Sequence, residues 1–348
     1  MWTKKPASAA LPDLMLGHGL VHPGRRGSAA TRSDLARRDR AGRAYSRVVI
    51  EIPDDFARET VLREGDAGRT WISTLPGLVN ELLQRWDCVP DGSVLHGHIG
   101  IIVPVRHTDL PPSVIKVSFP HPGNVYEPDA FSVWNGSGAV HLYGRDDEHF
   151  AMLLERAGQG TLADVADFDQ AVSTLGQLSQ RLAVGAPEEL PRLSDLVADW
   201  ESEIITTAAE LGNPLPRRAL DAAIATLREL GSDQPDTLVH GDLHDANVLP
   251  GDREPWLAID PKGYVGDRAY DTITVIRSIR FAHLLFGPNP EQGLSRGLDL
   301  FCESAGIDRE RARRWAQVRA IKAALWGRQH HDPGWVIQAT DQLVDILT

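Results

Sequence analysis

The pattern of hydrophobic and polar residues divides the chain into two parts of different character. From Val48 to about residue 154 the pattern is mixed, because a stripe of helical spacing over residues 71–86 precedes several short apolar runs bounded by Gly, Pro and Asp. Short runs of this kind are typical of strands in an antiparallel sheet. The predicted strands cover residues 92–98, 99–106, 112–119, 140–143 and 150–154.

After Thr161 the spacing of apolar residues becomes mostly helical. One exception is a predicted hairpin, in which the apolar runs 247–249 and 256–259 flank a turn rich in Pro and Gly. Ser194 is the expected N-cap of the second helix, and Gly231 is expected to end the third. The predicted helices cover residues 168–182, 193–211, 220–230, 271–286, 291–305, 308–329 and 334–347.

Charge is unevenly distributed along the chain. Residues 1–47 carry ten Lys and Arg against three acidic residues, whereas the whole chain of 348 residues has a net charge of −12. The basic stretch has almost no periodic pattern, which predicts a disordered extension over residues 1–44. An acidic body repels nucleic acid, and the basic arginines are not interleaved with aromatic residues, so we expect no nucleic-acid partner.

Cysteine content and hydropathy indicate the compartment. Only Cys88 and Cys302 are present, far apart in the sequence, so no disulfide framework is implied. No apolar run approaches the length of a membrane span, and the N-terminal stretch is broken by Pro12, Asp13 and His18 in a way that disfavours a secretory signal. We therefore expect a cytoplasmic protein without a membrane partner.

The stretch His240–Leu249 carries the strongest chemical signal. Its spacing, His-x-Asp-Leu-x-x-x-Asn, matches the catalytic-loop signature of kinases with Gly241 in the position of Arg. Phosphoryl transfer needs a carboxylate that orients the attacking hydroxyl and oxygen ligands that hold Mg²⁺, roles that suit Asp242 as the base and Asn247 with Asp260 as ligands. The alternative is that these residues only favour turns.

Lys116 is the candidate contact to a nucleotide. It lies within an apolar run, where a Lys usually has an anionic partner or substrate, and Glu127 follows eleven positions later at the start of a predicted short helix. A Lys and Glu pair of this kind positions nucleotide phosphates in kinases. A surface cation on an edge strand is the alternative interpretation of Lys116.

Two loops complete the predicted nucleotide site. Gly97 and Gly100 would let the backbone approach ATP phosphates, although such glycines usually mark only a turn. The stretch 155–160, which begins with Glu155, has the character of a hinge whose backbone groups would bind the adenine edge.

Together these motifs resemble the aminoglycoside phosphotransferase superfamily, over roughly residues 45–345. The resemblance is to its aminoglycoside/hydroxyurea antibiotic resistance kinase branch, which includes streptomycin 6-phosphotransferases. Leu-Leu-Glu-Arg at 153–156 and Asp-Pro-Lys-Gly at 260–263 narrow the resemblance to that branch. Asp245-Ala246 departs from the more usual Pro-Gly before the Asn.

The resemblance implies a two-lobed, protein-kinase-like α+β fold. An N-lobe with an antiparallel sheet and helices is expected over residues 45–154, a hinge over 155–160 and a mostly helical C-lobe over 161–348. It also implies that Asp242 is the catalytic base, that Asn247 and Asp260 hold Mg²⁺, and that Lys116 contacts ATP phosphates.

Lys262 and the acidic residues downstream remain open at the level of the sequence. Lys262 either stabilises charge on the transferring phosphoryl group or neutralises Asp260. Asp267 and Asp271 either line a site for a cationic substrate or have structural roles, of which capping the following helix is one for Asp267.

The predicted function is ATP- and Mg²⁺-dependent phosphorylation of a hydroxyl on a small cationic molecule, such as streptomycin or a related aminoglycoside. The alternatives are a kinase for another small metabolite, such as an amino alcohol or sugar amine, and a catalytically silent nucleotide-binding protein. The sequence leaves the phosphorylated position and the oligomeric state open.

Overall fold

A computed structural model describes residues 36–38, 44–46, 48–232, 234–272 and 285–348 of the chain. The basic extension predicted over residues 1–44 therefore lies largely outside the described residues, as does most of the helix predicted at 271–286. Within the extension, β1 (Ala36–Arg38) pairs antiparallel with β2 (Ala44–Ser46).

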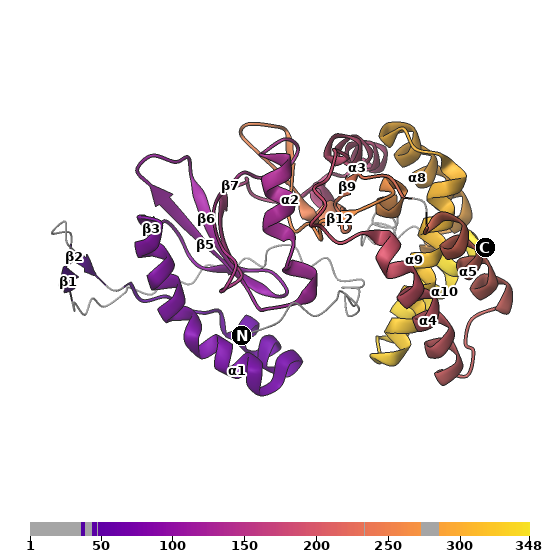
Figure 1. The fold of residues 1–348 in the computed structure, drawn as a ribbon, viewed down its shortest axis with the longest axis horizontal. Helices are drawn as coiled ribbons and strands as arrows, with labels where there is room; N and C mark the ends of the chain where they lie inside the picture. The colour runs from indigo at the N-terminus through magenta and orange to yellow at the C-terminus, as the bar shows by residue number, and fades with distance from the viewer. Residues whose placement is uncertain (1–35, 39–43, 47, 233, 273–284) are drawn as a thin grey trace. The chain divides into compact units, whose positions relative to one another are not determined.

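The described chain forms two compact units (Figure 1). Of the described residues, the sheet unit consists of those between 36 and 121 together with 141–156, and the helical unit consists of 122–140 together with those from 157 onward. Residues 122–140 thus belong to the helical unit, although they lie within the range 45–154 predicted for the N-lobe. Their contacts explain the difference, because Trp134 donates from Nε1 to the carbonyl of Leu182 at 2.8 Å in the helical unit.

An antiparallel sheet organises the first unit. Its strand order is β3-β5-β6-β8-β7, and β4 also pairs with β5. The strands are β3 (Cys88–Pro90), β4 (Leu95–His96), β5 (Gly100–His107), β6 (Ser113–Ser118), β7 (Leu142–Asp146) and β8 (Ala151–Glu155). The predicted antiparallel sheet is confirmed, and β6 lies at its centre.

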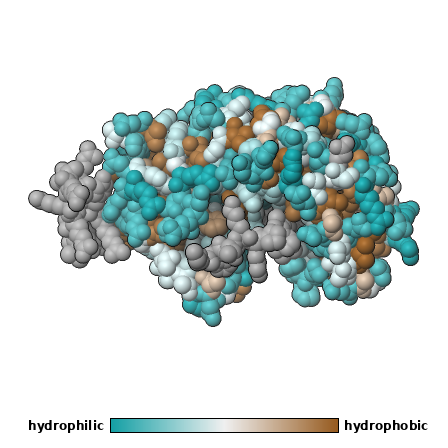
Figure 2. All heavy atoms as spheres, in the orientation of Figure 1, coloured by the Kyte–Doolittle hydropathy of each residue, from teal (hydrophilic) through white to brown (hydrophobic). Residues whose placement is uncertain are grey.

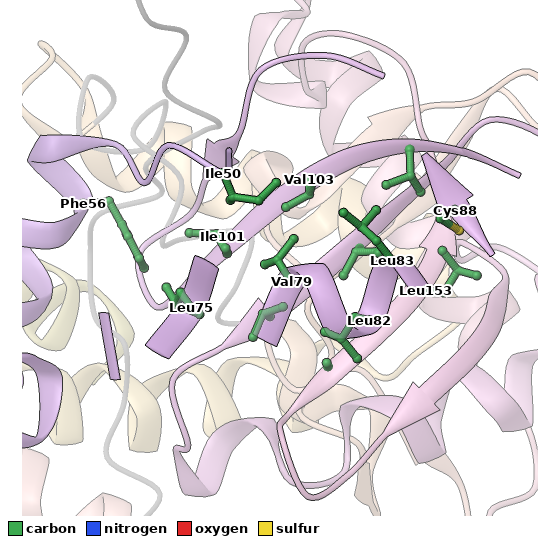
Figure 3. Packing of buried hydrophobic residues seen from close by; sticks show 14 residues of the cluster. Ile50, Phe56, Leu75, Val79, Leu82, Leu83, Cys88, Ile101, Val103 and Leu153 are labelled. Atoms are coloured by element: carbon green, nitrogen blue, oxygen red, sulfur yellow. The ribbon is translucent and has the colours of Figure 1, made fainter. Parts of the chain in front are cut away.

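Helix α1 (Asp54–Arg85), which consists of two helical stretches joined by a kink at Gly65, packs against this sheet (Figure 1). It begins 17 residues before the stripe that predicted it, because Gly65 at φ +62° interrupts the helical geometry and shifts the apolar phase. Its buried face packs against alternate residues of β5, as Figure 3 shows for Val79 beside Ile101 and Val103. The core is thus formed by apolar residues that recur about every 3.6 positions in the helix and every second position in the strand.

The second unit is mostly helical and also contains two short strand pairs. Among its described residues, the α-helices are α2 (Glu127–Trp134), α3 (Phe168–Leu182), α4 (Leu193–Glu210), α5 (Arg217–Leu230), α8 (Pro290–Ala305), α9 (Arg309–Gln329) and α10 (Gly334–Leu347). The predicted helices within the described residues are confirmed to within a few residues. Helix α9 is central, since it packs against α4, α5, α8 and α10.

The expected cap at Ser194 is wrong. Helix α4 has Arg192 as its N-cap residue, without a side-chain cap bond, and Ser194 lies inside the helix. The start of the helix is fixed instead by the backbone, because Arg192 forms a parallel bridge with Val265 and the carbonyl of Pro191 accepts from Val265 N–H at 2.8 Å.

The short strand pairs frame the stretch singled out by its motif. Strand β10 (Val248–Pro250) pairs antiparallel with β11 (Trp256–Ala258), which confirms the predicted hairpin. Strand β9 (Leu238–Val239) pairs with β12 (Tyr264–Val265). The 3₁₀ turns η3 (Asp245–Asn247) and η4 (Arg268–Asp271) follow β9 and β12 along the chain.

The surface is largely hydrophilic on the face that Figure 2 shows, where hydrophobic residues occur in small groups among polar and charged ones. Among the helices that the structure describes, none combines the length and the hydrophobicity that crossing a lipid bilayer requires.

Candidate active site

His240 anchors the loop that follows β9. Its side chain is fully buried, its ring stacks on Trp134 at 5.9 Å, and the amide N–H of Asp242 donates to its Nδ1 at 3.2 Å. Since Nδ1 accepts, Nε2 carries the proton and donates to the carbonyl of Ile259 at 2.9 Å. Burial lowers the pKa of His240 to about 4, so the ring is neutral at physiological pH.

Gly241 occupies a position that no other residue fits without strain. Its φ is +82°, and a Cβ there would lie 2.9 Å from both Cβ of Lys262 and Cδ2 of Tyr264. The backbone at Lys262 is also held against this loop, because the amide N–H of Lys262 donates to the carbonyl of His240 at 2.7 Å. The Gly that stands in place of the kinase Arg is thus a steric requirement of this loop.

Asp271 binds the backbone of this loop through hydrogen bonds. Its carboxylate accepts from the amide N–H of His240 at 3.1 Å and from that of Gly241 at 2.7 Å. The side chain is only 2% exposed, and burial raises the pKa of Asp271 to about 6 in spite of these bonds. A carboxylate so enclosed holds the backbone of the loop through these two bonds, and a role of Asp271 in lining a substrate site stays a prediction.

Asp242 follows directly on this fixed backbone. It is buried, and its carboxylate oxygen lies 3.9 Å from Nζ of Lys262. Its own carbonyl accepts from the amide N–H of His244 and from Nδ2 of Asn247, both at 3.0 Å. Lys262 is thus placed beside the predicted base, an arrangement that the sequence analysis did not consider.

Asn247 and Asp260 meet at the base of the hairpin. The amide N–H of Ile259 donates to the carbonyl of Asn247 at 2.9 Å, which continues the β10–β11 pairing and brings Asp260 next to Asn247 along the opposite strand. Because Nδ2 of Asn247 donates to a carbonyl, its Oδ1 is the atom left to act as a ligand. An amide oxygen and a carboxylate are ligands that suit Mg²⁺.

Asp260 adopts a left-handed backbone conformation with φ +58°. Such a conformation is uncommon for a residue with a Cβ, and it occurs more often at functional sites. Asp260 lies two residues after the end of β11, where the chain turns toward Lys262 and β12.

Asp267 is occupied by contacts within the protein. Its carboxylate caps η4 through the amide N–H of Ala269 at 2.9 Å, accepts from Nε1 of Trp315 at 2.8 Å and forms an ion pair with Arg311. The capping role weighed in the sequence analysis is confirmed. With only 5% of the residue exposed, Asp267 holds η4 against α9, and a role in binding the substrate stays a prediction.

Lys116 lies on the central strand β6, between Ile102 of β5 and Met152 of β8. It is 7% exposed, so the alternative of a surface cation on an edge strand is wrong. Glu127 is the first residue of α2, as expected, and is also buried. Because the two belong to different units, their pairing stays a prediction.

The glycines of the β4–β5 turn differ from each other. The amide N–H of Gly97 donates to the carbonyl of Gly100 at 2.9 Å, and a Cβ on Gly97 would meet nothing within 4 Å. A Cβ on Gly100 would lie 2.8 Å from the carbonyl oxygen of Val117, so strand pairing explains this Gly. A role of either residue in binding phosphates stays a prediction.

Residues at both ends of the predicted hinge 155–160 form hydrogen bonds with neighbouring segments. Oε2 of Glu155 accepts from the amide N–H of His141 at 3.0 Å within the sheet unit, and the amide N–H of Gly158 donates to the carbonyl of Pro250 at 2.7 Å within the helical unit. The side chain of Glu155 thus fastens β8 to the start of β7. Adenine binding by the backbone of this stretch stays a prediction.

Two residues beside the loop were not found from the sequence. Trp134 stacks on His240, and Arg319 of α9 donates from Nη1 to the carbonyl of Gly241 at 3.1 Å. Neither belongs to a motif, and Arg319 is one of several arginines on an amphipathic helix, so no sequence signal distinguishes it.

An antiparallel sheet unit, a helical unit and a loop that supplies a buried Asp with Asn and Asp at its base define a kinase-like phosphotransferase. Comparison with known proteins identifies the family. The family model of the aminoglycoside/hydroxyurea antibiotic resistance kinases matches residues 85–331, and the chain belongs to this family.

Individual relatives agree with this assignment. The chain is 36% identical over 280 residues to a streptomycin 6-kinase of Streptomyces glaucescens, with 80% of this chain and 91% of the relative covered. It is 34% identical over 293 residues to a hydroxyurea phosphotransferase of Kitasatospora aureofaciens, with 82% and 83% covered.

Solved structures support the fold. The aminoglycoside phosphotransferase APH(4)-Ia matches with a TM-score of 0.50 and 14% identity, over 80% of this chain and 99% of that one. The choline kinase LicA from Streptococcus pneumoniae matches with a TM-score of 0.51 and 13% identity, over 78% and 98%. At such identities these likenesses concern the fold alone.

Proposed function

We propose that this protein transfers the γ-phosphoryl group of ATP to a hydroxyl group of streptomycin or a related aminoglycoside. The observation that carries the proposal is the 34–36% identity to two streptomycin 6-kinases over 80% of this chain. The loop with buried Asp242 and Asn247, followed by the partly buried Asp260, supports it, since these are the groups that phosphoryl transfer requires.

Asp242 is the group that accepts the proton of the attacking hydroxyl. Its backbone is fixed by the His240 ring at its N–H and by Asn247 at its carbonyl, so the carboxylate is oriented before the substrate binds. Nζ of Lys262, 3.9 Å away, places a positive charge beside this carboxylate and favours negative charge nearby.

Asn247 and Asp260 are the residues that would hold Mg²⁺, with Oδ1 of Asn247 and the carboxylate of Asp260 as ligands. When bound, the ion neutralises charge on the phosphates. Lys116, on the central strand of the sheet unit, is the proposed contact to ATP phosphates, and Glu127 its proposed partner.

The acidic character of the chain suits a cationic acceptor. The net charge of −12 would concentrate a polycation near the protein and raise its association rate, and salt would weaken this effect. We therefore expect the KM for streptomycin to rise with ionic strength more steeply than the KM for ATP.

The test is ADP release by the full chain with ATP and Mg²⁺ across streptomycin, other aminoglycosides, hydroxyurea and common amino alcohols. Streptomycin-dependent turnover that Asp242→Asn reduces by at least about 10³-fold, with ATP affinity retained, would support the proposal. Turnover only with an amino alcohol would assign the protein to metabolism, and nucleotide binding without any turnover would indicate a silent relative.

Hydroxyurea is the second candidate acceptor, because the hydroxyurea phosphotransferase of Kitasatospora aureofaciens is 34% identical over 82% of this chain. The charge of the acceptor discriminates between hydroxyurea and an aminoglycoside. Hydroxyurea is small and neutral, so its turnover should be nearly independent of ionic strength, in contrast to that of a polycation.

A further inference from the structure

We infer that Arg319 of α9 is a positioning residue for phosphoryl transfer, which fixes the peptide unit before Asp242 and thereby aims the catalytic carboxylate. This inference rests on the proposed function, because Asp242 is the base of that reaction. It adds to the site a residue that lies 77 positions away in the chain and outside every motif.

The contacts of Arg319 fit such a role. Nη1 donates to the carbonyl of Gly241 at 3.1 Å, and the guanidinium carbon lies 4.3 Å from the centroid of the Tyr270 ring. A guanidinium on an aromatic ring is held in a defined plane, so that its N–H groups point outward in fixed directions.

The Tyr270 ring is itself immobilised. It stacks on Trp200 of α4 with a centroid distance of 5.6 Å and an interplanar angle of 7°, and it meets Trp315 of α9 edge to face at 5.8 Å. The guanidinium of Arg319 therefore packs on an aromatic ring that α4, η4 and α9 hold in place. From this fixed position it donates to the loop that contains Gly241.

Gly241 is held from both sides by this arrangement. Asp271 accepts from its amide N–H at 2.7 Å, and Arg319 donates to its carbonyl. A glycine has more backbone freedom than any other residue, so a glycine before the base leaves the base loosely placed unless its own peptide groups are fixed. Rotation at Gly241 would swing the carboxylate of Asp242 directly.

The charges of the two clamping residues also support each other. Asp271 is buried beneath the loop, and the positive charge of Arg319 opposes the effect of burial on the pKa of this carboxyl group. Arg319 thus helps to keep Asp271 ionised and able to accept two N–H bonds, in addition to its own bond to Gly241.

Arg314 offers a matched control. It lies on the same helix and is also partly buried, but it donates to Thr226 and Glu229 of α5 at 3.2 and 2.7 Å and not to the loop. Replacing Arg314 by Met removes an arginine from α9 and leaves the contacts of Gly241 in place.

The experiment compares Arg319→Met and Arg314→Met in the full chain by steady-state kinetics and by amide hydrogen exchange of residues 238–249. We expect Arg319→Met to lower kcat about 10- to 100-fold with the KM for ATP nearly unchanged, and to speed exchange at Gly241 and Asp242. Arg314→Met should change neither kcat nor this exchange by more than about twofold, whatever its thermal midpoint.

Chemical rescue separates positioning from a general loss of structure. In Arg319→Ala, guanidinium ion at a concentration well below denaturing should raise kcat, whereas in Arg314→Ala it should not. Arg319→Lys, which keeps the charge but not the planar fork, should retain more activity than Arg319→Met and serves if the Met variant does not fold.

The inference is overturned if Arg319→Met keeps kcat and loop exchange within about twofold of the wild type, or if Arg314→Met causes the same losses. Absence of guanidinium rescue together with a parallel fall of stability would also overturn it. A wild type without turnover on any acceptor would refute the proposed function instead, and the exchange comparison would still decide the role of Arg319.

Discussion

Replacing Asp271 by Asn should change how the stability of this protein depends on pH. The pKa of Asp271 is raised to about 6 by burial, against 3.8 for an exposed carboxyl group. Between these two values the folded state keeps a proton that the unfolded chain has lost, so the contribution of Asp271 to stability falls as pH rises and is lost above pH 6.

The magnitude follows from the shift. One pKa unit corresponds to about 1.4 kcal/mol, so the wild type should gain roughly 2 kcal/mol of stability relative to Asp271→Asn when the pH is lowered from 7.5 to about 4.5. The variant cannot titrate at this position. The contributions of most other titratable groups cancel when its free energy of unfolding is subtracted from that of the wild type. At neutral pH Asn offers one acceptor oxygen for two N–H groups, so kcat should also fall.

Urea unfolding of both proteins, followed by tryptophan fluorescence at several pH values, measures the difference. A stability difference that is the same at pH 4.5 and pH 7.5 would refute the reasoning, since it would mean that Asp271 does not titrate between those values. An unchanged kcat in Asp271→Asn would independently refute the assignment of Asp271 to positioning the loop.

Three further predictions concern the same site. His240→Gln should give the opposite pH effect, because the pKa of His240 is lowered to about 4 and the wild type should lose about 2.5 kcal/mol relative to the variant between pH 7.5 and 4.5 in the same urea measurement. Gly241→Ala should cost about 1–3 kcal/mol in urea unfolding and lower kcat, since the added Cβ needs a strained φ and a displaced loop; unchanged kcat would count against it. Trp315→Phe removes the indole donor to Asp267 and should lower stability by about 1–3 kcal/mol, and an unchanged midpoint in calorimetry would contradict this expectation.

Much of the fold could be predicted because the signals are local. The apolar stripes of α3, α8 and α10 and the turn between β10 and β11 follow from side-chain spacing and from Pro and Gly, which act within a few residues. The prediction of α1 was incomplete because Gly65 breaks the period, and that of the α4 cap was wrong because a bridge to Val265 fixes the start of the helix.

The candidate site shows the same division. The sequence by itself predicted the chemical groups of the candidate site, Asp242, Asn247 and Asp260, because phosphoryl transfer restricts both their types and their spacing. It also showed that Gly241 stands where the kinase signature has Arg, but it did not show the steric reason for this glycine.

Only the tertiary structure decided how those groups are held. The roles of Asp271, Asp267 and Arg319 depend on burial and on partners between 30 and 78 positions away in the chain. Spacing along a chain cannot report whether an acidic residue faces solvent or accepts two backbone N–H groups beneath a loop. Long-range packing makes that choice, because it sets the local dielectric environment and brings distant donors within reach.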